Sequence, residues 1–227
     1  MITNLHYMGP MRSGTTWFSL LLKHNFNLDV SEKYMGKHSP DEFFRGRWDG
    51  RQRLKVYREK EEEDQSLFLF IHRNVFAWLA SVRHYPFGAF HLRNKPMGEF
   101  IRSGFTSTTE RIRDDRHYAN FVEMRKLKFQ EWKRLEKSVG NFLNVPWEKV
   151  ALNTVPWLHK LASKYKLPIR NGCGPLEYIG DITDERRRYY SAHQYMREFT
   201  SEDINFVLSQ CDLETEKHFG YDYEEWL

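Results

Sequence analysis

The stretch Gly9–Trp17, GPMRSGTTW, concentrates residue types that bind a phosphate-like anion. Its two glycines, Gly9 and Gly14, allow the backbone to curl so that successive N–H groups converge on one anion. Ser13 adds a hydroxyl donor, and Arg12 adds a planar guanidinium that matches two oxygens of a phosphate or a sulfate. We therefore expect a tetrahedral anion to bind this loop.

The residue after the second glycine distinguishes this loop from the phosphate-binding loop of a nucleoside triphosphatase. Such enzymes carry a lysine there, whereas this chain has Thr15, followed by Thr16. Both threonines add hydroxyl donors for an anion. The apolar run at 66–72 ends without an acidic residue that could hold magnesium, so triphosphate hydrolysis has little support.

A second candidate anion site follows that apolar run, in RNVFAWLAS at 73–81. A helix that opens at residue 74 or 75 places Arg73 at its start and Ser81 about two turns along. Both side chains would then lie at the carboxyl edge of the sheet, where open α/β sheets bind ligands. The two motifs together predict two anion-binding points on one sheet edge.

The elements that must position these residues follow a strand-then-helix plan. Strands are predicted at 4–9, 66–74 and 141–146, the last ending at Pro146, and helices at 15–25, 75–85, 147–167 and 200–211. Thr200 or Ser201 is expected to cap the last helix. This alternation predicts an α/β fold of the P-loop type, with three layers and a central, mostly parallel sheet flanked by helices.

Two apolar stripes are expected to pack on that sheet. In the first helix, Trp17, Leu20 and Leu21 fall at core spacing. The second stripe belongs to the core or to a lid, and comprises Ile112, Phe121, Met124, Trp132 and Leu135.

Composition favours one domain over residues 1–227, because 227 residues with 40% hydrophobic content suffice for one sizeable core. A net charge of +4 suits an anionic ligand without requiring nucleic acid. The two cysteines, Cys173 and Cys211, are too few for a disulfide framework and are not spaced as metal ligands. We therefore expect a cytoplasmic protein without a leader peptide or a membrane span.

The motifs resemble those of a known family, the sulfotransferases. PMRSGTTW is similar to their 5′-phosphosulfate loop, PKSGTTW, in which several branches carry arginine. RNVFAWLAS resembles their 3′-phosphate motif, RNPxDxxxS, with the arginine and serine at the same separation. NFLNVPWEKV is similar to the segment written RYEDL in many members, and residues 199–223 resemble the common C-terminal helix and Gly-Tyr ending.

This resemblance implies that the donor is 3′-phosphoadenosine 5′-phosphosulfate (PAPS) and that no metal is needed. Arg12 would take the place of the family's loop lysine, bridging the sulfonate and the 5′-phosphate and stabilising charge on the leaving phosphate. The implied donor-binding residues are Arg12, Ser13, Gly14, Thr15, Thr16, Trp17, Arg73 and Ser81. The chain departs from the family pattern at Val75 and Ala77, and at Trp147 and Lys149.

Sulfuryl transfer to an alcohol also needs a base that takes the hydroxyl proton. His38, with Lys37 before it and Pro40 after it, resembles the Lys/His/Pro cluster that holds the base in many sulfotransferases. Glu32 lies twenty residues after Arg12, a spacing similar to that of the catalytic glutamate in the protein-tyrosine branch. We favour His38, with Glu32 as the alternative.

Two other classes of function fit the same residues. One is a P-loop kinase for a nucleotide or small molecule, with arginine doing the lysine's work. The other is a non-catalytic protein that binds adenosine 3′,5′-bisphosphate. The acceptor is left open among small molecules, sugars and lipid headgroups, and the residues expected to line its pocket are Trp48, Tyr85, Phe87, Phe90 and Arg93, with His84 and His91 as further candidates.

Overall fold

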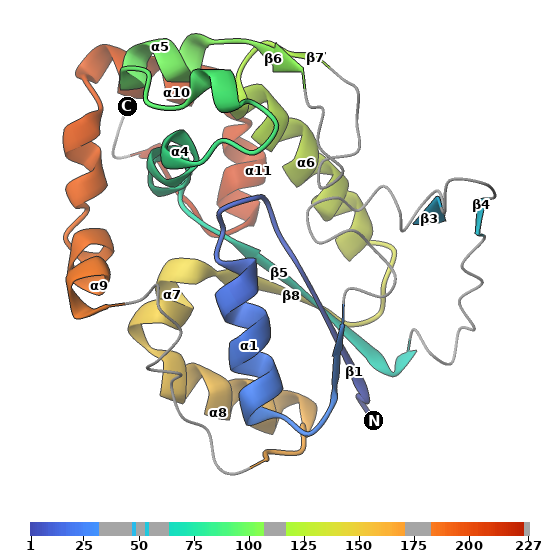
Figure 1. Cartoon of the computed structure of the whole chain (residues 1–227). Coiled ribbons are helices and arrows are strands. Elements are labelled where there is room, and N and C mark those ends of the chain that lie inside the picture. Colours follow the sequence, from blue (N-terminus) through green and yellow to red (C-terminus); the bar gives the residue numbers. More distant parts are fainter. Residues whose placement is uncertain (32–46, 49–52, 55–63, 107–116, 171–182, 225–227) are drawn as a thin grey trace.

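The computed structural model describes residues 1–31, 47–48, 53–54, 64–106, 117–170 and 183–224. Its centre is a parallel four-stranded sheet with the strand order β2-β1-β5-β8 (Figure 1). The four strands are β1 (Asn4–Met8), β2 (Asp29–Ser31), β5 (Ser66–His72) and β8 (Phe142–Pro146). Helices cover both faces of this sheet, which confirms the predicted α/β class.

Nine α-helices and two short 3₁₀ helices accompany the sheet within the described ranges. The helices are α1 (Thr15–Asn25), α4 (Val75–His84), α5 (Met97–Arg102), α6 (Phe121–Glu136), α7 (Trp147–Leu152), α8 (Thr154–Tyr165), α9 (Asp184–Ser191), α10 (Ser201–Gln210) and α11 (Leu213–His218), with η1 (Phe90–Leu92) and η2 (Gln194–Glu198). Two antiparallel pairs lie apart from the sheet and comprise β3 (Arg47–Trp48) with β4 (Arg53–Leu54) and β6 (Phe105–Thr106) with β7 (His117–Tyr118).

Successive side chains of each strand point to opposite faces of the sheet, so the apolar core has one part on each face. In β5, Leu69 joins the cluster that contains the apolar residues of α1 and α8, whereas Phe70 faces α6. The Phe70 ring stacks on Trp132 of α6 with centroids 4.8 Å apart. Every residue of β5 is buried, which explains why its sequence is continuously apolar. Figure 1 shows α1, α7 and α8 on one side of the sheet and α6 on the other.

The predicted apolar stripes are largely confirmed. Phe121, Met124, Trp132 and Leu135 are buried in α6, while Ile112 lies outside the described residues. The placement of Leu20 in the core was wrong, because its side chain is 39% exposed. The apolar face of α1 instead comprises Trp17, Phe18, Leu21 and Leu22. At 100° per residue, Leu20 lies on the opposite side of that helix.

Helix ends are fixed by the residues that the sequence offers for them. The Asn74 side chain accepts hydrogen bonds from the N–H groups of Phe76 and Ala77 and so begins α4. Thr200 and Asp203 form a capping box at the start of α10, as expected of Thr200. Each such cap stabilises its helix by about 1 kcal/mol.

Parallel registration brings the ends of three strands to one edge of the sheet. Met8 of β1 pairs with Phe70 of β5, and His72 of β5 pairs with Pro146 of β8. At Gly9 the loop after β1 passes so close to β5 that a Cβ atom there would lie 2.0 Å from the Ile71 carbonyl oxygen. The loop at 9–14, Arg73 and Trp147 therefore leave the sheet side by side.

Candidate functional site

The anion loop has the backbone conformation that its glycines and arginine permit. Gly14, the N-cap of α1, has φ 88°, and Arg12 has φ 63°, both in the left-handed region. The indole N–H of Trp78 in α4 donates a hydrogen bond of 2.7 Å to the Met11 carbonyl, so the loop is tied to the helix that follows β5. A left-handed non-glycine residue is strained, and such residues occur preferentially at ligand sites.

Arg73 lies beside this loop and is held by aromatic residues. Its guanidinium carbon is 4.1 Å from the centroid of the Trp147 ring, and its Nη1 donates to the Tyr190 hydroxyl at 2.9 Å. A Cβ built on Gly14 would lie 3.4 Å from Arg73 Nη2 and 2.7 Å from Trp147 Cδ1. Arg73 of the second predicted motif therefore lies beside Gly14 of the first, and Trp147, at the end of β8, contacts both.

Three buried polar atoms at this place have no hydrogen-bond partner among the described residues. They are Ser13 Oγ, Arg73 Nε and Trp147 Nε1. Leaving one such group unpaired costs about 1–3 kcal/mol, and more when it is charged. All three can donate a hydrogen bond, and they come from the loop, from the end of β5 and from the end of β8. Such a donor set fits an anion.

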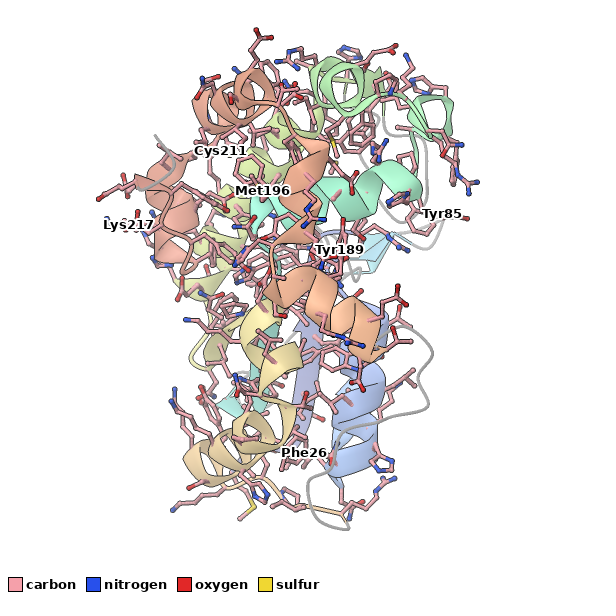
Figure 2. All side chains as sticks on the ribbon, turned by 90° about the vertical axis from the view of Figure 1, so that its left-hand side faces the viewer. Phe26, Tyr85, Tyr189, Met196, Cys211 and Lys217 are labelled. Carbon is pink, nitrogen blue, oxygen red and sulfur yellow. The ribbon has the colours of Figure 1, made fainter. Side chains whose placement is uncertain are left out.

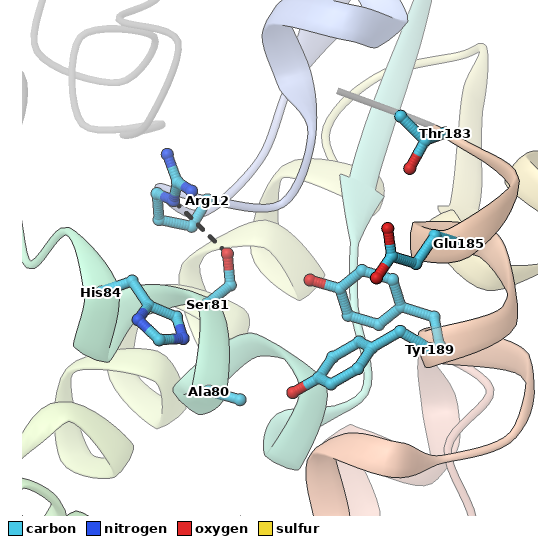
Figure 3. Close-up of a pocket in the computed structure, with 8 residues that line it drawn as sticks. Arg12, Ala80, Ser81, His84, Thr183, Glu185 and Tyr189 are labelled. Carbon is cyan, nitrogen blue, oxygen red and sulfur yellow. Dashed lines mark hydrogen bonds between the residues drawn. The ribbon is translucent and has the colours of Figure 1, made fainter. Parts of the chain in front are cut away.

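A cavity of about 420 Å³ opens next to the loop. Arg12 Nε donates to Ser81 Oγ at 3.3 Å on one wall, and Glu185 and Tyr189 of α9 stand across from them (Figure 3). His84 lines the same wall as Ser81. The cavity thus joins an arginine, hydroxyl groups and aromatic rings from segments far apart in the chain.

The turn around Arg73 is supported from the C-terminal part of the chain. Glu148 accepts hydrogen bonds from the Asn74 N–H at 2.9 Å and from the Tyr221 hydroxyl at 2.8 Å. Tyr223 Oη accepts from the Val75 N–H at 3.0 Å. Burial raises the pKa of both tyrosines well above 10, so both remain neutral. Tyr223 thus satisfies the N–H of Val75, the first residue of α4, which has no intrahelical partner.

A buried ion pair between α6 and α11 also supports the turn around Arg73. Arg125 of α6 binds Glu216 of α11 through two hydrogen bonds, of 2.6 and 2.8 Å. Its Nη2 also donates to the carbonyl oxygen of Arg73 at 2.8 Å. The position of Arg73 therefore depends on two helices as well as on the strand that it follows.

The remaining predicted residues fall into three groups. Thr15 is buried and Thr16 exposed at the start of α1. Trp17 is buried and stands edge-on to Trp147, with centroids 6.5 Å apart, so it packs in the core beside the loop. Both candidate bases, His38 and Glu32, lie outside the described residues.

The predicted acceptor side forms an aromatic surface cluster. Tyr85 contacts Phe87 and Phe90, with ring centroids 4.5 and 5.2 Å apart, and the Arg93 guanidinium lies 5.7 Å from the Tyr85 ring. Tyr85 lies at the outer edge of the face shown in Figure 2. The side chain of Trp48, the remaining aromatic residue predicted for this side, lies outside the described part of the structure. This cluster follows directly on His84, which lines the cavity.

Sequence reasoning missed Tyr190 and the part that Trp147 plays beside Arg73. The sequence shows Trp147 as a departure from a family pattern, although a residue that directly follows a parallel strand lies at the sheet edge. For Tyr190 the sequence gives no signal, because it meets Arg73 across 117 residues of chain.

Neither a metal cluster nor a membrane span is found in the parts of the chain that the structure describes. No group of three or more His, Cys, Asp or Glu side chains there could hold a metal ion. None of the helices there is long and apolar enough to cross a bilayer. Comparisons with protein-family models, with curated proteins and with solved structures found no match to this chain.

Proposed function

We propose that this chain is a sulfotransferase of the PAPS-dependent, P-loop type. The observation that carries the proposal is the meeting of two arginines at one sheet edge, Arg12 inside a glycine loop that lacks the triphosphatase lysine and Arg73 beside Gly14. The three unpartnered buried donors, Ser13, Arg73 and Trp147, support an anionic ligand at that point.

The donor supplies a sulfuryl group, which passes to a hydroxyl or amine of the acceptor. The loop would hold the 5′-phosphosulfate through Arg12 and the hydroxyls of Ser13, Thr15 and Thr16, with the positive end of α1 behind them. Arg12 would also stabilise the charge that develops on the leaving phosphate. Arg73 and Ser81 would hold the 3′-phosphate, and none of these roles requires a metal.

Proton removal from the acceptor is assigned to His38, with Glu32 as the alternative. A neutral imidazole can accept a proton near neutral pH. A general base of this kind contributes about 10²–10⁴-fold to a rate. His84 and the aromatic cluster at 85–93 would meet the acceptor, which we leave open among small molecules, sugars and lipid headgroups.

Binding measurements distinguish this proposal from the two alternatives. Adenosine 3′,5′-bisphosphate should raise the melting temperature, and ATP with magnesium should raise it much less. A kinase would show the reverse order and magnesium-dependent ATP turnover. A non-catalytic binding protein would respond to the bisphosphate but would transfer no label from ³⁵S-labelled PAPS to any acceptor in a panel.

Variants of two arginines complete the test. Arg12→Ala should weaken bisphosphate binding and remove transfer, because Arg12 lies at the loop and in the cavity. Arg170→Ala is the matched control, since Arg170 is exposed and follows α8 at the opposite end of the sheet, where its backbone N–H bonds to Asn25. If both substitutions reduced bisphosphate binding and transfer equally, the assignment of the loop as the donor-binding site would be refuted.

A further inference from the structure

Tyr190 of α9 contacts the arginine that the proposed function assigns to the 3′-phosphate. Its hydroxyl accepts a hydrogen bond from Arg73 Nη1 at 2.9 Å, and its ring centroid is 5.0 Å from the guanidinium carbon. The Tyr190 ring also meets Trp147 edge-on, with centroids 4.8 Å apart. Arg73 is therefore enclosed between two aromatic side chains from different elements.

These contacts fix the orientation of the guanidinium and leave one of its N–H donors, at Nε, unpaired. A guanidinium has five N–H donors in one plane. The Trp147 face sets that plane, and Tyr190 takes one donor at Nη1. Arg73 Nε has no partner among the described residues, and Nη2 lies toward Gly14. The plane of Arg73 is thus held, while its buried Nε–H donor is left without a partner among the described residues.

Tyr190 also belongs to the cavity wall. It lines the cavity together with Arg12 and Ser81, although its side chain is buried. A phenol that accepts a hydrogen bond from arginine keeps its own proton for donation. A tyrosine that served only to pack against Trp147 would have no need of its hydroxyl at this place.

We propose that Tyr190 is a positioning residue, which holds Arg73 in the orientation that binds the 3′-phosphate of the donor. The inference rests on the proposed function and extends it to a helix that the sequence motifs do not include. Preorganisation of this kind raises affinity because the arginine loses less conformational freedom when the ligand binds.

The test compares two neighbouring tyrosines by isothermal titration calorimetry. Tyr190→Phe keeps the ring and removes only the hydroxyl. It should weaken binding of adenosine 3′,5′-bisphosphate by about 3- to 10-fold, the size of one hydrogen bond. Tyr195→Phe is the matched control, because the Tyr195 ring lies beside Tyr190, with centroids 6.1 Å apart, but its hydroxyl is hydrogen-bonded to His193 at 2.7 Å and it does not line the cavity. Its affinity should stay within about twofold of the unmutated chain.

Two further measurements distinguish positioning from general loosening. Adenosine 5′-monophosphate lacks the 3′-phosphate, so Tyr190→Phe should leave its affinity unchanged. In an Arg73→Ala background, which by itself should cost about 10- to 100-fold in bisphosphate affinity, Tyr190→Phe should have no additional effect. Arg73→Lys should lose nearly as much as Arg73→Ala, because an ammonium has no plane to hold.

Each of the contrary results has a definite meaning. Equal weakening of both nucleotides, a full effect of Tyr190→Phe in the Arg73→Ala background, or near-native affinity of Arg73→Lys would overturn the positioning role. So would an unchanged or higher bisphosphate affinity of Tyr190→Phe. If the unmutated chain binds no bisphosphate at all, the proposed function itself fails, whereas loss of affinity on Arg73→Ala without any effect at Tyr190 refutes this inference alone.

Discussion

The ion pair between Arg125 and Glu216 supports a quantitative prediction about stability. The two side chains are 0% and 4% exposed, and Glu216→Ala would leave the guanidinium buried without its counter-charge. Burial lowers the pKa of Arg125, but Glu216 raises it above its ordinary value, so the arginine is charged in the unmutated chain. Breaking such a pair costs about 3–5 kcal/mol, a large part of the roughly 5–15 kcal/mol that a typical domain has.

The same two helices supply the control. Lys133 of α6 and Glu214 of α11 form a second ion pair at 3.1 Å, in which the Glu214 side chain is 89% exposed. Glu214→Ala should therefore cost about 0–1 kcal/mol. Urea unfolding followed by tryptophan fluorescence measures both variants. With a slope of about 3 kcal/mol per molar, Glu216→Ala should lower the midpoint by about 1–2 M.

A functional consequence accompanies the loss of stability. Arg125 also holds the carbonyl oxygen of Arg73, so Glu216→Ala should weaken bisphosphate binding in the fraction that stays folded. Replacing both partners, as in Arg125→Met with Glu216→Leu, should recover most of the stability but not the affinity. The reasoning is refuted if Glu216→Ala and Glu214→Ala unfold at the same urea concentration.

Three further predictions concern single positions. Gly14→Ala should abolish bisphosphate binding in calorimetry, because φ is 88° and a Cβ would lie 2.7 Å from Trp147; native affinity would contradict this loop geometry. Burial lowers the pKa of His72 from 6.5 to about 3, so only the unfolded chain takes up this proton between those pH values. The free energy of unfolding should therefore fall by about 1.4 kcal/mol for each unit by which the pH is lowered in this range, and by less in His72→Gln. If the urea midpoints of the two proteins change with pH in parallel, this prediction is refuted. His38→Ala should keep bisphosphate affinity and lower transfer by roughly 10²–10⁴-fold, unless Glu32→Ala does so instead, which would move the base to Glu32.

The sequence could predict those parts of the fold that depend on local pattern. The strand at Ser66–His72 could be predicted because a fully buried strand has a continuously apolar sequence. The helix at Val75–His84 could be predicted because Asn74 before it is a favoured N-cap residue. Registration in a parallel sheet then brings Arg73 to the loop at Gly14, as expected. Local pattern and sheet geometry together thus suffice for the core of the candidate site.

Contacts between distant segments could not be predicted in the same way. No periodicity links Arg73 to Tyr190 or Arg125 to Glu216, because these pairs form only when helices pack. Leu20 shows the limit for single residues, since the apolar face of α1 is centred between Phe18 and Leu21 and excludes it.

The hydrogen bonds that Tyr221 and Tyr223 make with the turn around Arg73 determine when the site can form during synthesis on the ribosome. Tyr223 meets Val75 across 148 residues. At roughly 5–20 residues per second, about 7–30 s pass between the emergence of the two partners. During that interval a nascent chain can form the strand and the loop but cannot complete the turn. Ligand binding should therefore be acquired late in translation, after the sheet itself has formed.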